Sequence, residues 1–147
     1  MSRTDGEAGA QAAALPPVSR RAATVLYIED NRSNLELVQR ILARRREVTL
    51  LVAMQGQPGM EMAAARAPDL ILLDLHLPDV PGEEVLRRLR EAPQTRAIPV
   101  VVISADAIPA QIERLLAAGA QAYLTKPLDV AQFLSLLDQI LQERRVL

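Results

Sequence analysis

A short apolar run that ends on a carboxylate constrains this chain more than any other stretch. Residues 70–73 read Leu-Ile-Leu-Leu, and Asp74 follows them directly, before a proline-containing loop and Gly82. Four consecutive bulky aliphatic residues predict a strand that is buried on both faces, as in a parallel sheet. Such a strand delivers Asp74 to its carboxyl end, which is the edge where open α/β sheets bind their ligands.

Composition narrows the classes of protein that remain. The chain has 147 residues, of which 50% are hydrophobic and only 2% aromatic, so we expect one domain with a sizeable aliphatic core. The absence of cysteine excludes disulfide scaffolds, thiol catalysis and cysteine-based metal sites. A net charge of −1 gives no general attraction to nucleic acid or to a membrane surface. We therefore expect a cytoplasmic protein that binds neither nucleic acid nor membrane directly.

The N-terminal stretch differs from the rest of the chain. Residues 1–23 are rich in alanine, glycine, proline and charge, and they show no helical or strand period. Asp5 and Glu7 occupy a region where a signal peptide would be apolar. We expect residues 1–23 to form a disordered tail or linker and residues 24–147 to form the domain.

Five aliphatic runs alternate with five amphipathic stretches along the domain. The predicted strands are residues 24–29, 48–53, 70–74, 99–104 and 122–125. A helix is predicted after each of them, at about residues 31–45, 58–68, 84–91, 109–118 and 130–143. Strict alternation favours a parallel sheet that is covered on both faces. The expected fold class is α/β, a flavodoxin-like doubly wound (βα)5 sheet with strand order 2-1-3-4-5 and helices on both faces.

The spacing of apolar residues also predicts which helix faces are buried. In the helix of residues 58–68, Met62 and Ala65 are expected to face the core. The apolar stripe of the helix at residues 84–91 leaves its basic side chains in solvent, namely Arg87, Arg88 and Arg90.

Polar side chains collect where the predicted strands end. Glu29 and Asp30 follow the first strand, Asp74 the third, Ser104 the fourth and Lys126 the fifth. With strand order 2-1-3-4-5, the first and third strands are neighbours, so the three carboxylates crowd together. Like charges this close raise one another's pKa values unless a cation joins them, and ligands that are all oxygen suit Mg²⁺.

This arrangement points to phosphoryl transfer. A metal-bound Asp74 would be held for in-line attack on a phosphoryl group. The metal, Ser104 and Lys126 would then offset charge on the phosphoryl oxygens. We interpret Asp74 as the phosphate acceptor of the chain.

Four motifs occur in one order along the domain. They are Leu26-Tyr-Ile-Glu-Asp30, Asp74-Leu-His-Leu-Pro-Asp-Val-Pro-Gly82, Ile103-Ser104-Ala105 and Tyr123-Leu-Thr-Lys126-Pro127. Together they resemble the receiver domain of a two-component response regulator, over residues 24–143. The spacing from Tyr27 to Asn34 is similar to that of receivers attached to hybrid histidine kinases, and whether the chain is a stand-alone regulator or part of such a kinase stays open.

The resemblance implies a phosphoacceptor and a metal site. Asp74 would accept a phosphoryl group from a phosphohistidine of a sensor histidine kinase or phosphotransfer protein. Asp30 and Asp74 would bind Mg²⁺, Glu29 would do so through water, and the backbone carbonyl of His76 would be a further ligand. As a signalling receiver rather than an enzyme, the domain would catalyse only its own phosphorylation and slow dephosphorylation.

The resemblance also implies a switch. Ser104 and Lys126 would contact the phosphoryl oxygens, and Lys126-Pro127 would be a cis peptide. Tyr123 would change rotamer when Ser104 moves toward the phosphate. The surface formed by the fourth helix, the fifth strand and the fifth helix would then change, and it would bind an unidentified downstream protein or a second copy of the chain.

Two positions depart from the family pattern. Pro81 stands where receivers usually carry Asp, Asn or Ser, so the cap of the following helix is open and Asp79 is the alternative. The turn before the second strand reads Arg45-Arg46-Glu47 in place of a glycine–aromatic pair. Neither departure touches the acidic residues.

Three other functions compete with this interpretation. An aspartyl phosphatase would carry a second aspartate where this chain has His76, which is its only histidine and more typical of a tuning or surface residue. A flavin or nucleotide binder would have a glycine-rich or hydroxyl-rich loop after the first strand, whereas Glu29 and Asp30 make this loop acidic. A pseudo-receiver that acts only as a protein-interaction module remains the alternative, although its acidic pocket should be broken.

Overall fold

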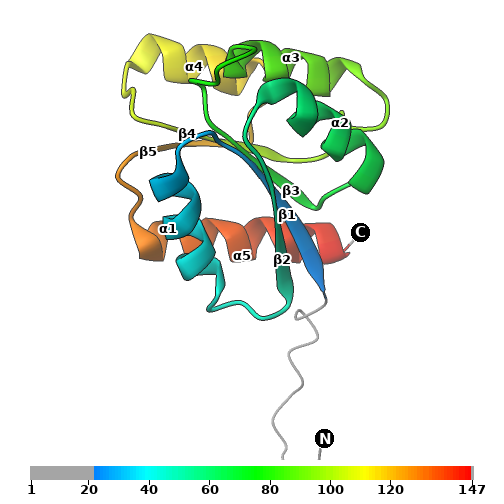
Figure 1. Cartoon of the computed structure of the whole chain (residues 1–147), viewed down its shortest axis with the longest axis vertical. Helices are drawn as coiled ribbons and strands as arrows, with labels where there is room; N and C mark the ends of the chain where they lie inside the picture. Colours follow the sequence, from blue (N-terminus) through cyan, green and yellow to red (C-terminus); the bar gives the residue numbers. More distant parts are fainter. Residues whose placement is uncertain (1–21, 147) are drawn as a thin grey trace, which may run out of the picture.

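Strands and helices alternate without exception in the part of the chain that the computed structural model describes, residues 22–146 (Figure 1). The expectation of a disordered tail falls outside these residues except at its last two positions. The elements are β1 (Ala23–Ile28), α1 (Arg32–Leu42), β2 (Val48–Ala53), α2 (Gly56–Arg66), β3 (Leu70–Leu73), α3 (Gly82–Glu91), β4 (Val100–Ser104), α4 (Pro109–Ala117), β5 (Ala122–Thr125) and α5 (Val130–Val146). No helix in this range combines the length and the apolar character that crossing a bilayer would require.

The sheet has the predicted topology. Its strand order is β2-β1-β3-β4-β5, and every neighbouring pair is parallel. Helices α1 and α5 cover one face, and α2, α3 and α4 cover the other (Figure 1). Each face carries its own apolar cluster, so the sheet forms the middle of three layers.

The central strands are buried throughout, as their uninterrupted aliphatic runs predicted. All four residues of β3 and all five of β4 are buried. Such strands hold the loops after them firmly, because each strand is packed on both faces and hydrogen-bonded on both edges. The first strand begins one residue before the predicted boundary, since Ala23 is already paired with Val48 and buried.

Helix α2 packs through small residues, and the predicted inward face was wrong in part. Gly56, Gly59 and Ala63 are the buried positions of this helix, whereas Ala65 is exposed and Met62 only half-buried. A Cβ atom at Gly59 would lie 2.7 Å from Cδ1 of Ile28 in β1. The helix therefore approaches the sheet closely because this face lacks large side chains.

Asp79 caps a helix, but not the one that the sequence suggested. Its carboxylate accepts hydrogen bonds from the backbone N–H groups of Gly56, at 2.7 Å, and Gln57, at 2.9 Å, at the start of α2. These hydrogen bonds hold the pKa of Asp79 below its usual value. Helix α3 begins at Gly82, and Pro81 before it provides no side-chain cap; two glutamates in its first turn lie at the positive end of its dipole.

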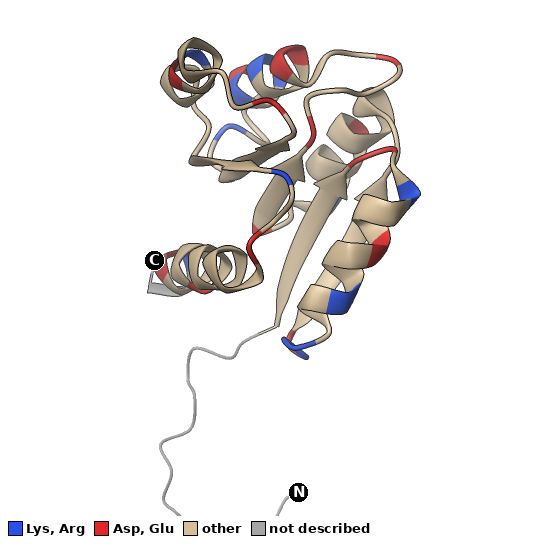
Figure 2. Cartoon of the chain, turned by 90° about the vertical axis from the view of Figure 1, so that its left-hand side faces the viewer, with Lys and Arg blue, Asp and Glu red and all other residues tan. Residues whose placement is uncertain are grey.

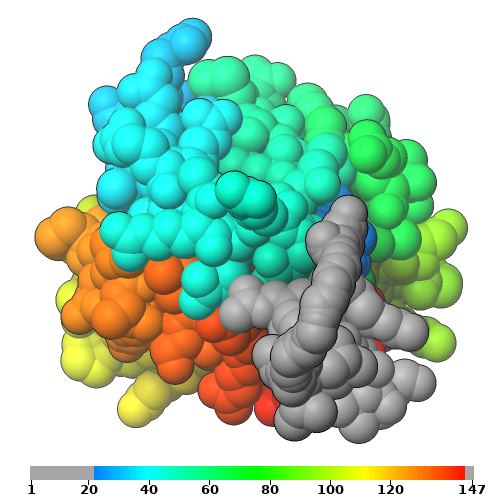
Figure 3. All heavy atoms as spheres, turned by 90° about the horizontal axis from the view of Figure 1, so that it is seen from below, coloured from blue at the N-terminus to red at the C-terminus, as the bar shows by residue number. Residues whose placement is uncertain are grey.

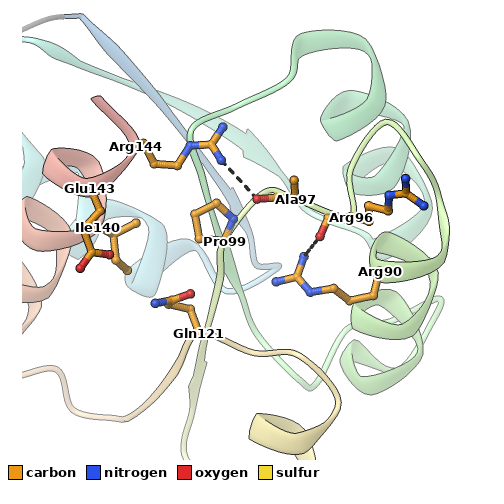
Figure 4. A pocket seen from close by; sticks show the side chains of 8 residues that line it. All are labelled: Arg90, Arg96, Ala97, Pro99, Gln121, Ile140, Glu143 and Arg144. Atoms are coloured by element: carbon orange, nitrogen blue, oxygen red, sulfur yellow. Dashed lines mark hydrogen bonds between the residues drawn. The ribbon is translucent and has the colours of Figure 1, made fainter. Parts of the chain in front are cut away.

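Arg90 is half-buried rather than solvated. Its guanidinium donates to the carbonyl oxygens of Gly119, Ile98 and Arg96, at 2.7 to 3.2 Å (Figure 4 shows the last of these bonds). Burial lowers the pKa of Arg90 from its ordinary value. Gly119 has a φ of +116°, which suits glycine, and a Cβ there would collide with Arg90. Arg90 thus ties α3 to the turn that ends α4.

A second arginine joins the turn after α1 to the last helix. Helix α1 ends at Leu42, before the predicted limit at Arg45, and Arg45 forms a two-bond ion pair with Asp138 of α5 at 2.8 and 2.9 Å. Seen from below, the chain between α1 and β2 (cyan) lies beside α5 (orange to red) in Figure 3. The pair therefore connects the turn after α1 to α5 on this face of the sheet.

We predict that Gly82→Ala destabilises the fold. A Cβ at Gly82 would lie 2.5 Å from the carbonyl oxygen of Asp74 and 2.6 Å from Cα of Leu75, and both are backbone atoms that cannot turn aside. Overpacking of this kind costs about 2 kcal/mol of unfolding free energy, which urea denaturation measures. Glu113→Ala, on the exposed side of α4, is the control and should change little. An unchanged midpoint for Gly82→Ala would contradict the close approach.

Candidate functional site

Three carboxylates meet at the carboxyl edge of the sheet. Each of Glu29, Asp30 and Asp74 offers an oxygen within 4.8 Å of the other two. The pairing of Ile28 with Leu73 explains this, because Glu29 and Asp74 are the next residues of neighbouring parallel strands. Glu29 and Asp74 are 1% and 3% exposed, while Asp30 is exposed. Figure 2 shows acidic positions in the loops that follow the strands at this edge.

One ammonium group serves the two buried carboxylates. The Nζ of Lys126, just after β5, lies 3.0 Å from Oε1 of Glu29 and 3.2 Å from Oδ1 of Asp74. The second oxygen of Asp74 accepts a hydrogen bond from the backbone N–H of His76 at 3.2 Å. Both oxygens of Asp74 are therefore held by donors on different elements.

The local electrostatics remain unbalanced toward negative charge. Burial raises the pKa of Asp74, the charge of Glu29 raises it further, and the opposing effects of Lys126 and the His76 N–H do not cancel this. Burial by itself lowers the pKa of Lys126, but hydrogen bonds and charge from Glu29 and Asp74 raise it above its ordinary value, so its ammonium stays charged. Among the described residues, one ammonium faces three carboxylates, which leaves negative charge that a further cation would offset.

The donors fit a hard divalent ion. All three groups offer carboxylate oxygen, which is the ligand type that Mg²⁺ prefers, and the exposed Asp30 leaves a side open to water. The backbone carbonyl of His76 as a further ligand stays a prediction. The ring of His76 turns to a neighbouring loop, with Nε2 at 2.9 Å from Oδ2 of Asp106.

Ser104 and Tyr123 are linked through Asp106. Ser104 is fully buried at the end of β4, and its Oγ accepts a hydrogen bond from the N–H of Asp106 at 3.1 Å. The hydroxyl of Tyr123 donates to the carbonyl oxygen of Asp106 at 2.8 Å and accepts from Gln111 of α4 at 3.1 Å. The hydroxyl of Ser104 is thus engaged with the loop after β4, and the backbone of Asp106 connects it to the ring of Tyr123.

Sequence reasoning missed two residues that contact the site. Oε1 of Glu29 accepts hydrogen bonds from the Tyr27 hydroxyl at 3.0 Å and from Nδ2 of Asn34 at 3.2 Å. A signal for Tyr27 was present, because residues two apart in a strand face the same side and a buried tyrosine hydroxyl needs a partner. Asn34 lies in the first turn of α1. Its contact with Glu29 depends on how the chain turns between β1 and α1, which the sequence pattern does not indicate.

Two of the hollows among the described residues lie at opposite ends of the sheet. A hollow of about 300 Å³ adjoins the acidic residues and is lined by Tyr27, Asn34, Leu37, Ile103, Lys126, Pro127 and Leu128. A slightly larger one of about 340 Å³ lies between the loop before β4 and α5 (Figure 4). There Arg90 and Arg144 donate to backbone carbonyls, which is a structural use of both side chains. The acidic residues therefore mark the candidate site, although the adjoining hollow is the smaller one.

Comparison with known proteins agrees with this geometry. The family model for the response regulator receiver domain matches residues 25–138. The chain belongs to the response regulator receiver family. Its curated relatives include the polar-differentiation response regulator DivK of Brucella anthropi, 33% identical over 111 residues, which are 76% of this chain and 89% of that protein.

Solved receiver structures share its fold. The receiver domain of a sensor histidine kinase from Pseudomonas aeruginosa, with a magnesium ion coordinated in its active-site cleft, is 27% identical with a TM-score of 0.73, covering 82% of this chain and 98% of that one. The phosphorylated cyanobacterial phytochrome response regulator RcpA is 30% identical with a TM-score of 0.66, covering 83% and 90%. Receiver domains are signalling modules of two-component systems that bind Mg²⁺ at an acidic pocket, and the carboxylates of this receiver are compatible with that.

We predict that Asp74→Asn stabilises the metal-free protein at neutral pH. The pKa of Asp74 is raised on folding, so the folded state holds a proton more readily than the unfolded state. This contribution to stability is lost as pH rises from the ordinary carboxyl range through the raised pKa. The neutral amide of the variant would remove both this titration and the repulsion with Glu29. Thermal unfolding between pH 4 and pH 8 should therefore show a flatter profile and a higher melting temperature at pH 7 for the variant.

Added Mg²⁺ provides the internal check on this prediction. The ion should stabilise the wild-type protein more than the variant, because it binds the folded state through the carboxylate that the variant lacks. Glu113→Gln, which removes an exposed carboxylate on α4, should follow the wild-type profile. A variant no more stable than the wild type at pH 7 would show that Lys126 alone balances the carboxylates.

Proposed function

We propose that this receiver accepts a phosphoryl group on Asp74 from the phosphohistidine of a sensor histidine kinase or phosphotransfer protein. The observation that carries the proposal is the environment of Asp74: a buried carboxylate at the end of a central strand, bonded to Lys126 and within 4.8 Å of two other carboxylates. Glu29 shares these contacts at the end of β1, but Asp74 follows β3, the middle strand of the sheet, and its second oxygen is held by the His76 N–H.

The proposed reaction is an in-line displacement. An oxygen of Asp74 attacks phosphorus, the new O–P bond forms as the P–N bond breaks, and the imidazole nitrogen keeps the electron pair. Glu29, Asp30 and Asp74 would hold Mg²⁺, and when bound the ion supplies positive charge against the oxygens of the transferred group. The backbone N–H of His76 and the ammonium of Lys126 fix the direction of the carboxylate before attack.

Lys126 would follow the charge during transfer. Before the reaction its ammonium is shared between Glu29 and Asp74. A phosphoryl group brings up to two negative charges and three acceptor oxygens to Asp74, and Lys126 is the cation within reach of them. The buried hydroxyl of Ser104 lies at the end of β4, which pairs with β3, so it is the neutral donor that we expect to contact the phosphoryl group.

The contacts of Ser104 suggest how the signal leaves the pocket. If the Ser104 hydroxyl turns to the phosphoryl group, its hydrogen bond with the Asp106 N–H is lost. The carbonyl of the same residue holds the Tyr123 hydroxyl, which also binds Gln111 of α4. Movement of this loop therefore changes both the ring of Tyr123 and the start of α4. Phosphorylation would bias a pre-existing equilibrium between the two arrangements.

The output surface that we propose consists of α4, β5 and α5. It carries two exposed large apolar side chains at α4, Ile108 at 55% and Leu116 at 42% exposure. A shallow hollow of about 330 Å³ lies between β5 and α5, with Tyr123 in its lining. Apolar groups and a hollow beside the proposed switch suit a downstream protein or a second copy of this chain. The same surface would serve a pseudo-receiver, which would bind without phosphorylation.

Phosphorylation of the purified chain tests the acceptor. With phosphoramidate and Mg²⁺, we expect the intact mass to rise by one phosphoryl group in the wild type and in Asp138→Asn, whose carboxylate lies on α5. Asp74→Asn should gain none, and Asp30→Ala should lose the phosphorylation that depends on Mg²⁺. Phosphate on the Asp74 variant would place the acceptor elsewhere, and a wild type that never reacts would favour the pseudo-receiver.

Amide NMR spectra test the output surface. Adding beryllofluoride and Mg²⁺ should shift the amides of residues 104–107, Tyr123 and α4, while those of α2 near Met62 move much less. Tyr123→Ala should still be phosphorylated on Asp74 but show weaker shifts in α4, because it lacks the bond to the Asp106 carbonyl. Shifts confined to the pocket, or strongest in α2, would rule out this route.

A further inference from the structure

We infer that Tyr27 and Asn34 are positioning residues for Glu29. They hold its carboxylate so that one oxygen faces the cation site, and they allow Lys126 to move away from Glu29 toward a phosphoryl group. The inference rests on the proposed function, because it concerns how the acidic residues are prepared for a cation and a phosphoryl group. It assigns a role to a buried hydroxyl and to an amide on α1 that the proposed reaction does not otherwise use.

The two oxygens of Glu29 have very different surroundings. Oε1 accepts from three side-chain donors: the Tyr27 hydroxyl at 3.0 Å, Nδ2 of Asn34 at 3.2 Å and Nζ of Lys126 at 3.0 Å. Oε2 accepts only from the backbone N–H of Asn31, at 3.2 Å, among the residues that the structure describes. A carboxylate oxygen has two lone pairs, so three donors saturate Oε1. A cation, or a water bound to it, must therefore approach Glu29 through Oε2.

The length of the side chain makes this anchoring necessary. Glutamate has one more rotatable bond than aspartate, so its carboxylate needs additional contacts to hold a single orientation. Tyr27 supplies one of them from β1, two residues before Glu29, and Asn34 supplies the other from α1. Since Tyr27 is 1% exposed, its hydroxyl has little access to bulk water as an alternative partner.

The Tyr27 hydroxyl is suited to act only as a donor. The carboxylate of Glu29 can only accept a hydrogen bond, so the phenol of Tyr27 directs its hydrogen toward Oε1, at 3.0 Å. Its hydrogen bond to a charged acceptor belongs to the stronger class of protein hydrogen bonds.

These donors also affect Lys126. When the ammonium turns to a phosphoryl group, Glu29 loses one of the donors to Oε1 and keeps two. Without Tyr27 and Asn34, Lys126 would be the one side-chain donor left to the buried carboxylate of Glu29 among the described residues. Glu29 would then hold the ammonium more firmly. A cation entering the site would then compete with a more tightly held ammonium, so the loss of either donor should weaken Mg²⁺ binding.

A double-mutant cycle tests whether the Tyr27 hydroxyl positions Glu29 or whether its hydrogen bond only offsets the cost of burying the hydroxyl. The variants are Tyr27→Phe, Glu29→Asp and the two combined, and the measurement is the Mg²⁺ dissociation constant from amide NMR titration of the full chain. Tyr27→Phe should weaken Mg²⁺ binding by roughly tenfold, as loss of an outer contact to a metal ligand does. In the Glu29→Asp background, whose carboxylate is one methylene shorter and withdrawn from the phenol, the same change should have little effect.

Each outcome of the cycle decides something different. Equal weakening in both backgrounds, no weakening, or tighter binding would overturn the positioning role and leave the acceptor proposal intact. A wild type that binds no Mg²⁺ at all would contradict the proposed metal site and the inference with it. Asn34→Ala offers an independent variant, because it removes the other donor to Oε1 of Glu29. It should weaken Mg²⁺ binding when residue 29 is glutamate but not in Glu29→Asp. Urea unfolding of each variant checks that the fold is retained.

Discussion

The sharing of one ammonium between two buried carboxylates is the interaction on which the site depends. Lys126 follows β5, Glu29 follows β1 and Asp74 follows β3, so their contacts at 3.0 and 3.2 Å exist only if three strands of the sheet are in register. Buried charges are costly unless they are paired and hydrogen-bonded. The parallel sheet makes the pairing possible, because it brings strand ends that are distant in sequence to one edge.

The pairing is incomplete, and this incompleteness suits function. Burial and the charge of Glu29 raise the pKa of Asp74, and Lys126 does not offset them fully, which is a local cost to the folded state. Neutral side chains at these positions would relieve that cost but could not bind a divalent ion. If the site binds a cation as we propose, some stability of the metal-free protein is given up for that affinity, a trade-off that is common where function requires concentrated charge.

The sequence predicts the sheet and its acidic edge well, because both follow from local patterns. The runs in β3 and β4 are uninterrupted, and the chemistry-bearing residues come immediately after strands. The misplaced features depend on contacts between distant segments. Asp79 caps α2, 23 residues earlier, rather than α3 next to it, because the loop folds back over Gly56. The close approach of α2 to Ile28 depends on Gly59, so the positions of large apolar residues did not predict which face of this helix is buried.

The two tyrosines lie on opposite sides of the proposed phosphorylation site, and their contacts differ in kind. Tyr27 binds Glu29 directly and is fully enclosed, so it belongs to the fixed part of the site. Tyr123 reaches Ser104 only through Asp106 and is partly exposed near α4, so its contacts can change without opening the core. Linkage makes such a coupling reciprocal: a partner that prefers the altered Tyr123 surface must also favour the phosphorylated site by the same free energy. A rigid side toward β1 and a movable side toward α4 would direct the effect of one added phosphoryl group to one surface of the domain.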